Sequence, residues 1–126
     1  MKSLTLTLGT CAALAALNLV ASPTAQAAAS SLATTVTRVV VTGNTNFGGC
    51  MAALAVSPTT KLATCGATYV TFDCAAVFPS TQAVQAYRML DQAQLALALA
   101  KPVVVNFTDS LKANGYCLAT RIDVLK

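Results

Sequence analysis

The side chains with the most distinctive chemistry in this sequence are its five cysteines, at positions 11, 50, 65, 74 and 117. The chain has no histidine, glutamate or tryptophan, and its carboxylates are Asp73, Asp91, Asp109 and Asp123. Histidine and glutamate are the usual general bases, and the spacing of the four aspartates suggests no pair for acid–base work. The composition therefore argues against an enzyme and directs attention to the cysteines.

The first 27 residues are typical of a secretory signal peptide. Lys2 precedes an apolar run of about 17 residues from Leu4 to Val20, and a polar stretch then ends at Ala25-Gln26-Ala27, a small-residue pattern that signal peptidase cleaves. A membrane anchor is the weaker alternative, because a spanning helix needs roughly 20 apolar residues. We expect residues 1–27 to be removed, Cys11 included. Residues 28–126 then form a secreted protein, extracellular or periplasmic, with no membrane span.

The charge of the mature chain does not predict nucleic-acid binding. Seven of the eight lysines and arginines lie after residue 27, against four aspartates, which leaves a net charge of +3. These cations are scattered, without a run and without interleaved aromatic residues. The glycines of NTNFGGC lack the spacing and the lysine of a phosphate-binding loop. No cofactor is expected.

The four cysteines that remain after cleavage admit three pairings. Cys50 begins the segment CMAALAV and Cys74 ends the segment TYVTFDC, each on the same face as the apolar side chains. In an antiparallel hairpin these two positions meet, which predicts a Cys50–Cys74 disulfide. In YCLATRIDVL, Cys117 lies on the face opposite the more apolar one, so we expect it to hold a covering loop through Cys65.

A zinc site is the alternative use of these four cysteines. Their spacings are long, no histidine is present, and a secreted context favours disulfides. We therefore predict two disulfides and no metal.

The mature chain has five strand candidates and one helix, with no internal repeat and no linker. The strands are predicted at residues 34–41, 50–56, 68–74, 103–108 and 116–125, and the helix between Ser80 and Lys101. A helix between the third and fourth of five strands is the order of the OB-fold, a small, partly closed barrel. We predict this mainly β fold, although other α+β folds accommodate the same order.

The predicted helix is apolar on more than one side. Helical spacing predicts a barrel-facing stripe of Ala83, Ala86, Tyr87, Leu90, Ala93 and Leu97. The opposite side begins with glutamines but continues as Leu95, Ala96 and Leu99. A second apolar side of a helix usually packs against a second surface, which shields it from water. The alternative is that alanine and leucine are simply good helix formers.

Three stretches together carry a resemblance to a known family. FGGC, the cysteine that ends the third strand candidate, and YRMLDQAQLALALAKPVVVNF resemble the pentameric B subunits of bacterial AB toxins, particularly the subtilase cytotoxin B subunit and its secreted relatives. The closest local match is LDQAQ at mid-helix, and the similarity covers roughly residues 34–124. It implies an OB-fold, a homopentameric ring, binding to cell-surface glycans, and a separate A subunit that does the enzymatic work.

The resemblance also implies roles for individual residues. In such rings the helices line the central pore and pack near subunit boundaries, so Met89, Leu95 and Leu99 would face neighbouring subunits. A serine just upstream of the first strand contributes to sugar binding in the subtilase cytotoxin B subunits. Ser31, with Ser30 beside it, is nearest to that position, and the alternative is a disordered mature N-terminus.

Other residues are further candidates for sugar binding, because carbohydrate sites commonly pair a ring face with amides. They are Asn44, Asn46, Phe47, Tyr69 and Tyr116, each of which could equally be an ordinary strand or turn residue. The alternative function is a stand-alone secreted interaction or structural protein, stabilised by disulfides and without a toxin partner.

Overall fold

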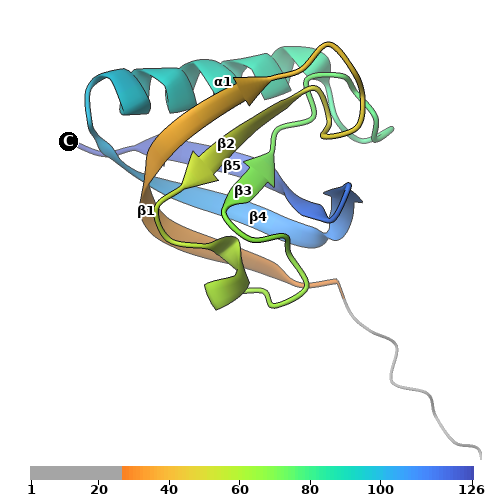
Figure 1. The fold of residues 1–126 in the computed structure, drawn as a ribbon, viewed down its shortest axis with the longest axis horizontal. Coiled ribbons are helices and arrows are strands. Elements are labelled where there is room, and N and C mark those ends of the chain that lie inside the picture. Colours follow the sequence, from red (N-terminus) through yellow and green to blue (C-terminus); the bar gives the residue numbers. More distant parts are fainter. Residues whose placement is uncertain (1–26) are drawn as a thin grey trace, which may run out of the picture.

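The computed structural model describes residues 27–126, and the predicted signal peptide lies outside the described residues apart from Ala27. The chain runs through β1 (Ala29–Val41), β2 (Cys50–Leu54), the 3-10 turn η1 (Pro58–Thr60), β3 (Tyr69–Thr71), α1 (Ala83–Ala98), β4 (Pro102–Ala113) and β5 (Tyr116–Val124). Figure 1 shows α1 lying across one end of the strands and η1 at the other. No helix in the described part of the chain is long and apolar enough to cross a membrane.

The strands close into a barrel in the order β1-β2-β3-β5-β4, with α1 between β3 and β4 in sequence. This is the predicted mainly β OB-fold arrangement. Neighbouring strands are antiparallel except β3 and β5, which meet in parallel through the single pair Thr71 and Leu118. The barrel is uneven, because long ladders join β4 to β1 and β5 while β3 contributes only three residues.

The first strand starts five residues earlier than predicted. Ala29 to Thr35 pair with β4, and Val36 to Val41 pair with β2, so one long strand contributes to both sides of the barrel. Ser30 and Ser31 therefore lie within a strand, and the alternative of a disordered terminus is wrong for them. Serines and alanines at the outward positions concealed the alternation that buries Leu32 in the core.

A β-bulge corrects the predicted faces of the last strand. Phe107 pairs with Ala119 whereas Asn106 pairs with Arg121, which leaves Thr120 as an extra residue. The bulge shifts the alternation by one position, so Cys117 is fully buried in the same core as Ile122. The prediction that Cys117 lies on the opposite face from Ile122 was wrong for this reason.

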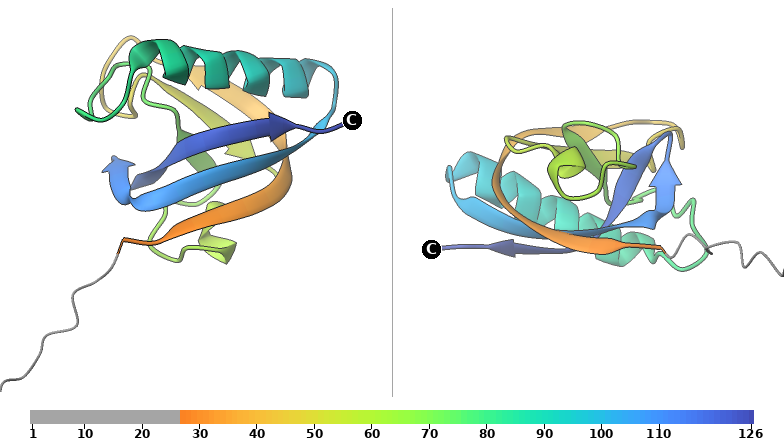
Figure 2. Two further views of the ribbon diagram at one scale, coloured as in Figure 1. Left: turned by 180° about the vertical axis from the view of Figure 1, so that it is seen from behind. Right: turned by 90° about the horizontal axis from the view of Figure 1, so that it is seen from below.

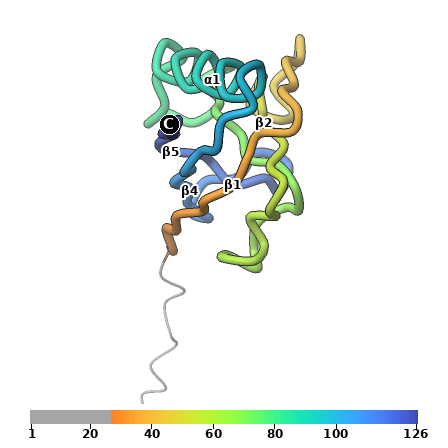
Figure 3. The backbone as a smooth tube through the Cα atoms, turned by 90° about the vertical axis from the view of Figure 1, so that its left-hand side faces the viewer, coloured from red at the N-terminus to blue at the C-terminus, as the bar shows by residue number. Residues whose placement is uncertain are grey.

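The helix packs on the barrel through small side chains, and its orientation differs from the predicted one. α1 contacts β1, β2 and β5 and covers one barrel end in two perpendicular views (Figures 1 and 3). Its buried residues are Ala86, Leu90, Ala93 and Ala96. Tyr87 and Leu97 were predicted to pack on the barrel, but they are 50% and 39% exposed. Ala96, predicted to face outward, is buried, because alanines allow a close approach to the strands.

Two disulfides staple the barrel, at the pairs predicted from the sequence. Cys50–Cys74 joins the start of β2 to the segment after β3, with 5.5 Å between the Cα atoms. Cys65–Cys117 joins the loop before β3 to β5, with a Cα separation of 5.2 Å. Disulfides persist in oxidising compartments, so the pair indicates a non-cytoplasmic location.

Candidate functional site

Three aromatic rings gather around one hollow on the barrel surface. Phe47 and Tyr69 both approach Tyr116, with ring centroids 5.9 Å and 5.8 Å away from it. The rings are partly exposed, and with Arg38, Met51 and two further β1 and loop residues they line a hollow of about 230 Å³. We call this site the aromatic hollow.

The rings of the aromatic hollow come from three separate segments. Phe47 lies in the loop between β1 and β2, Tyr69 begins β3 and Tyr116 begins β5. The Cys65–Cys117 disulfide lies directly beside Gly66 and Tyr116 in sequence and draws these two residues together. A Cβ on Gly66 would lie 2.6 Å from the Tyr116 ring. The disulfide and the glycine therefore position the central ring.

The lining of the aromatic hollow combines aromatic ring faces with one positively charged group. Its lining residues include one guanidinium, Arg38, and no carboxylate. Ring faces and a partly exposed hydroxyl suit a ligand with both apolar and hydroxylated faces. Of the other residues predicted to contact sugar, Asn44 lines a neighbouring hollow with Tyr87, and its side chain accepts from the backbone N–H of Asn46 at 3.2 Å.

The two serines predicted to bind sugar line a different hollow, of about 410 Å³. In the β1–β4 ladder Ser31 pairs with Asn106, and Ser31 is exposed. The bulged Thr120 is also exposed, and its hydroxyl donates to the Asn106 carbonyl at 3.3 Å. This serine hollow has hydroxyls and one amide, but its only ring, that of Phe107, is 1% exposed.

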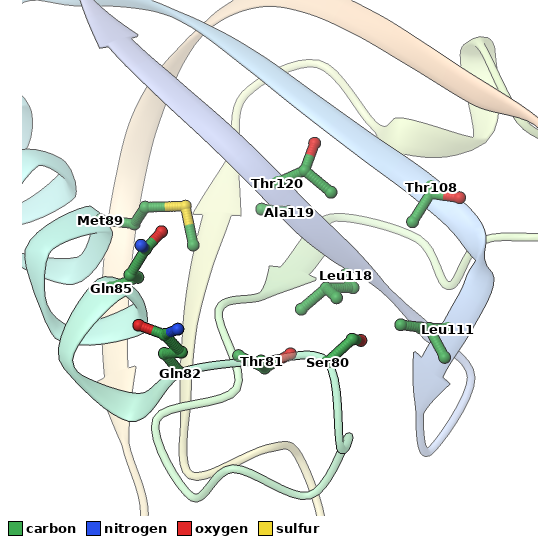
Figure 4. Close-up of a pocket in the computed structure, with 10 residues that line it drawn as sticks. All are labelled: Ser80, Thr81, Gln82, Gln85, Met89, Thr108, Leu111, Leu118, Ala119 and Thr120. Atoms are coloured by element: carbon green, nitrogen blue, oxygen red, sulfur yellow. The ribbon is translucent and has the colours of Figure 1, made fainter.

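A fourth hollow, the polar groove, lies where the start of α1 meets β4 and β5 (Figure 4). It has a volume of about 300 Å³ and is lined mainly by hydroxyl, amide and aliphatic groups of Ser80, Thr81, Gln82, Gln85, Met89, Thr108, Leu111, Leu118, Ala119 and Thr120. Of these, only Met89 was given a functional role from the sequence. The groove was missed because its residues come from three distant segments, none with a recognisable motif.

The three residues predicted to face neighbouring subunits have different surroundings. Met89 packs partly against the core of its own chain and points into the polar groove (Figure 4). Leu95 and Leu99 are 46% and 57% exposed on the side of α1 away from the barrel. Val84 is also exposed on this side, whereas the exposed Tyr87 lies toward the β1 end and lines the hollow with Asn44. We call Val84, Leu95 and Leu99 the outer helix face.

Asp73 is a buried carboxylate that accepts hydrogen bonds from the backbone of its own loop. It is 0% exposed and has a positive φ of 64°. Its two oxygens accept from the backbone N–H groups of Val77 and Phe78 at 2.8 Å and 3.0 Å. These bonds hold the loop that follows the Cys50–Cys74 disulfide.

Replacing Asp73 by alanine should lower the free energy of unfolding by at least about 2 kcal/mol, because two N–H groups of the loop lose their acceptor. Asp73→Asn keeps one acceptor oxygen and tolerates the positive φ, so its loss should be smaller. Urea unfolding of both variants measures the difference. An alanine variant as stable as the wild type would contradict this role.

The remaining acidic residues form no metal centre in the described part of the chain. Among residues 27–126 there is no group of three or more cysteine or aspartate side chains that could hold a metal ion. Asp123 pairs with Arg121 at 2.8 Å on the surface.

Comparison of the chain with protein-family models, curated proteins and solved structures finds no match. The functional interpretation therefore depends on the hollows and on the outer helix face.

Proposed function

We propose that the mature chain is a secreted, non-catalytic glycan-binding subunit that assembles into a homopentameric ring. The observation that carries glycan binding is the aromatic hollow, where three rings and a guanidinium converge. The short motifs that resemble toxin B subunits support the same function. A separate A subunit is the partner that this resemblance implies.

The chemistry of the aromatic hollow favours a sugar with an acidic group. Aromatic side chains provide a large contact area with little loss of conformational freedom, and their faces can pack on the C–H faces of a sugar ring. Arg38 is exposed at the rim, where its guanidinium can bind a carboxylate through two parallel hydrogen bonds. We therefore propose an acidic glycan on this surface.

The outer helix face supports assembly of the chain with copies of itself. Val84, Leu95 and Leu99 are between 46% and 61% exposed, on the helix side that the barrel does not cover. In rings of B subunits the helices pack near subunit boundaries, which makes another copy of this chain the proposed cover. Apolar side chains grouped on one surface commonly mark such interfaces.

Binding to a glycan array tests the proposed function. We expect the secreted protein to bind acidic glycans, and Arg38→Gln and Phe47→Ala each to weaken this binding at least tenfold, equivalent to about 1.4 kcal/mol. Lys61→Gln is the matched control, because it removes a positive charge from an exposed loop outside the hollow.

A Ser31→Ala variant distinguishes the aromatic hollow from the serine hollow. Ser31 lies outside the aromatic hollow, so its loss should leave binding unchanged. If only the Ser31→Ala variant lost glycan binding, the binding site would be the serine hollow and not the aromatic hollow. If the folded wild type binds no glycan, the proposed function is wrong.

A further inference from the structure

The main chain of Ala28 is held tightly at the start of β1. Its N–H donates to Oδ1 of Asp109 at 2.7 Å, and its carbonyl accepts from the Asp109 N–H at 3.0 Å and from the Thr108 hydroxyl at 3.1 Å. The second carboxylate oxygen of Asp109 accepts from the Thr64 hydroxyl at 2.7 Å. Asp109 thus joins the beginning of β1, the loop before β3, and β4. The beginning of β1 lies at the end of the barrel opposite α1 (Figure 2).

The residue that this cluster holds is the first one after the predicted cleavage position. The small-residue pattern ends at Ala27, and Ala27 is exposed. The nitrogen that donates to Asp109 is therefore the atom that cleavage would turn into the chain's amino group.

We propose that signal peptidase cleavage after Ala27 docks the new N-terminal ammonium of Ala28 on the Asp109 carboxylate, so that processing itself fastens β1 to β4. Water adds to the Ala27 carbonyl carbon and the Ala27–Ala28 C–N bond breaks. The leader retains a carboxylate and Ala28 retains the nitrogen as –NH3+ at neutral pH. The Ala28 nitrogen, a neutral amide donor to Asp109 before cleavage, thereby becomes a positively charged ammonium donor in the same place. The inference rests on the secretion in the proposed function and not on glycan binding.

The charged groups around the new terminus are few. Asp109 is the carboxylate that faces the Ala28 nitrogen, and Thr64 contributes a neutral hydroxyl from the loop. On β4, the Lys112 ammonium donates to the Thr64 carbonyl at 3.3 Å. The pKa of Asp109 is lowered, first by the Thr64 hydroxyl, then by the Ala28 N–H, with a smaller contribution from Lys112. At neutral pH the carboxylate is therefore ionised while the amine is protonated.

The docked amine makes stability depend on pH in a defined direction. A chain-terminal amine has an ordinary pKa of about 7.7 to 8.0, and the carboxylate raises this value in the folded state. A raised folded-state pKa adds stability that is complete below the unfolded-state pKa. That stability is lost as the pH rises through the folded-state pKa. The ammonium–carboxylate contribution should therefore be present at pH 7 and absent at pH 10.

The full chain, secreted with its leader by a bacterial host, provides the test. Mass spectrometry should show that the purified protein begins at Ala28. An NMR titration of the Ala28 amine should give a pKa above about 8, which returns to the ordinary range in Asp109→Asn. A variant with Gly-Ser inserted between Ala27 and Ala28, and cleaved before the insert, is the second comparison. It keeps the Asp109 hydrogen bond but moves the ammonium away.

Thermal unfolding gives an independent measurement. The melting temperature of the wild type should exceed that of the extended variant at pH 7 by a few degrees, and the difference should disappear at pH 10. An ordinary amine pKa in a correctly cleaved wild type, or a first residue other than Ala28, overturns this inference alone. Recovery of the protein only with its leader attached overturns secretion as well. Glycan binding plays no part in these measurements, so its failure leaves them unaffected.

Discussion

Replacing Leu95 and Leu99 by lysine should convert the assembled protein into folded monomers. Both leucines lie on the outer helix face and contribute little to the chain's own core. At a packed subunit boundary, two lysines would lose their hydration without a partner. In the monomer the same lysines are compatible with the helix, because they lie toward its C-terminus and one falls four residues after Asp91. Light scattering and circular dichroism measure mass and fold together.

Two control experiments separate assembly from folding. Ala63→Lys with Ala67→Lys adds the same charge at exposed positions between η1 and β3, away from α1, and should leave the assembly intact. Leu90→Ala removes a side chain that is 4% exposed and should cost about 2 to 5 kcal/mol of folding stability. A wild type that stays monomeric at every concentration would show that the ring is wrong. The stand-alone secreted protein would then be the better interpretation.

Removing the Cys65–Cys117 disulfide should have the largest effect on stability. This bond spans 52 residues in sequence and Cys50–Cys74 spans 24. In the chain-entropy description, loops of these lengths correspond to about 4 and about 3.5 kcal/mol of stabilisation. A small domain has about 5 to 15 kcal/mol in total. Replacing either pair by alanines should therefore lower the urea midpoint strongly, and slightly more for Cys65–Cys117.

The two disulfides should differ more in their effect on binding. Gly66 and Tyr116 are the sequence neighbours of the Cys65–Cys117 bond, so its removal releases the central ring of the aromatic hollow. Removal of Cys50–Cys74 leaves that ring in place and is the matched comparison. Glycan binding at a temperature where both variants are folded should be weakened only by loss of Cys65–Cys117. Equal binding by the two variants would contradict the positioning role.

Local sequence patterns determined the order of the elements and the Cys50–Cys74 disulfide, whereas the Cys65–Cys117 pair was predicted from a face of the last strand that the structure corrects. Strand-like segments, a proline after the helix, and turn-rich connections predicted the β-β-β-α-β-β order that the barrel has. Alternation along CMAALAV and TYVTFDC brought Cys50 and Cys74 together correctly. Such patterns identify the elements because periods of two and of about 3.6 residues are properties of a few consecutive residues.

The tertiary structure decided the faces and the sites. The bulge at Thr120 turned Cys117 into the core, because strand register depends on the partner strand as well as on the sequence of the strand itself. The helix, with alanine and leucine on most sides, took its orientation from the barrel, which left Tyr87 outside.

The convergence of distant residues also belongs to the tertiary structure. Phe47, Tyr69 and Tyr116 were separate candidates in the sequence, and closure of the barrel brings their rings together. Ala28 and Asp109 are 81 residues apart and meet only because β1 pairs with β4. No local pattern encodes such contacts, since they depend on how long-range strand pairing and core packing arrange the whole chain.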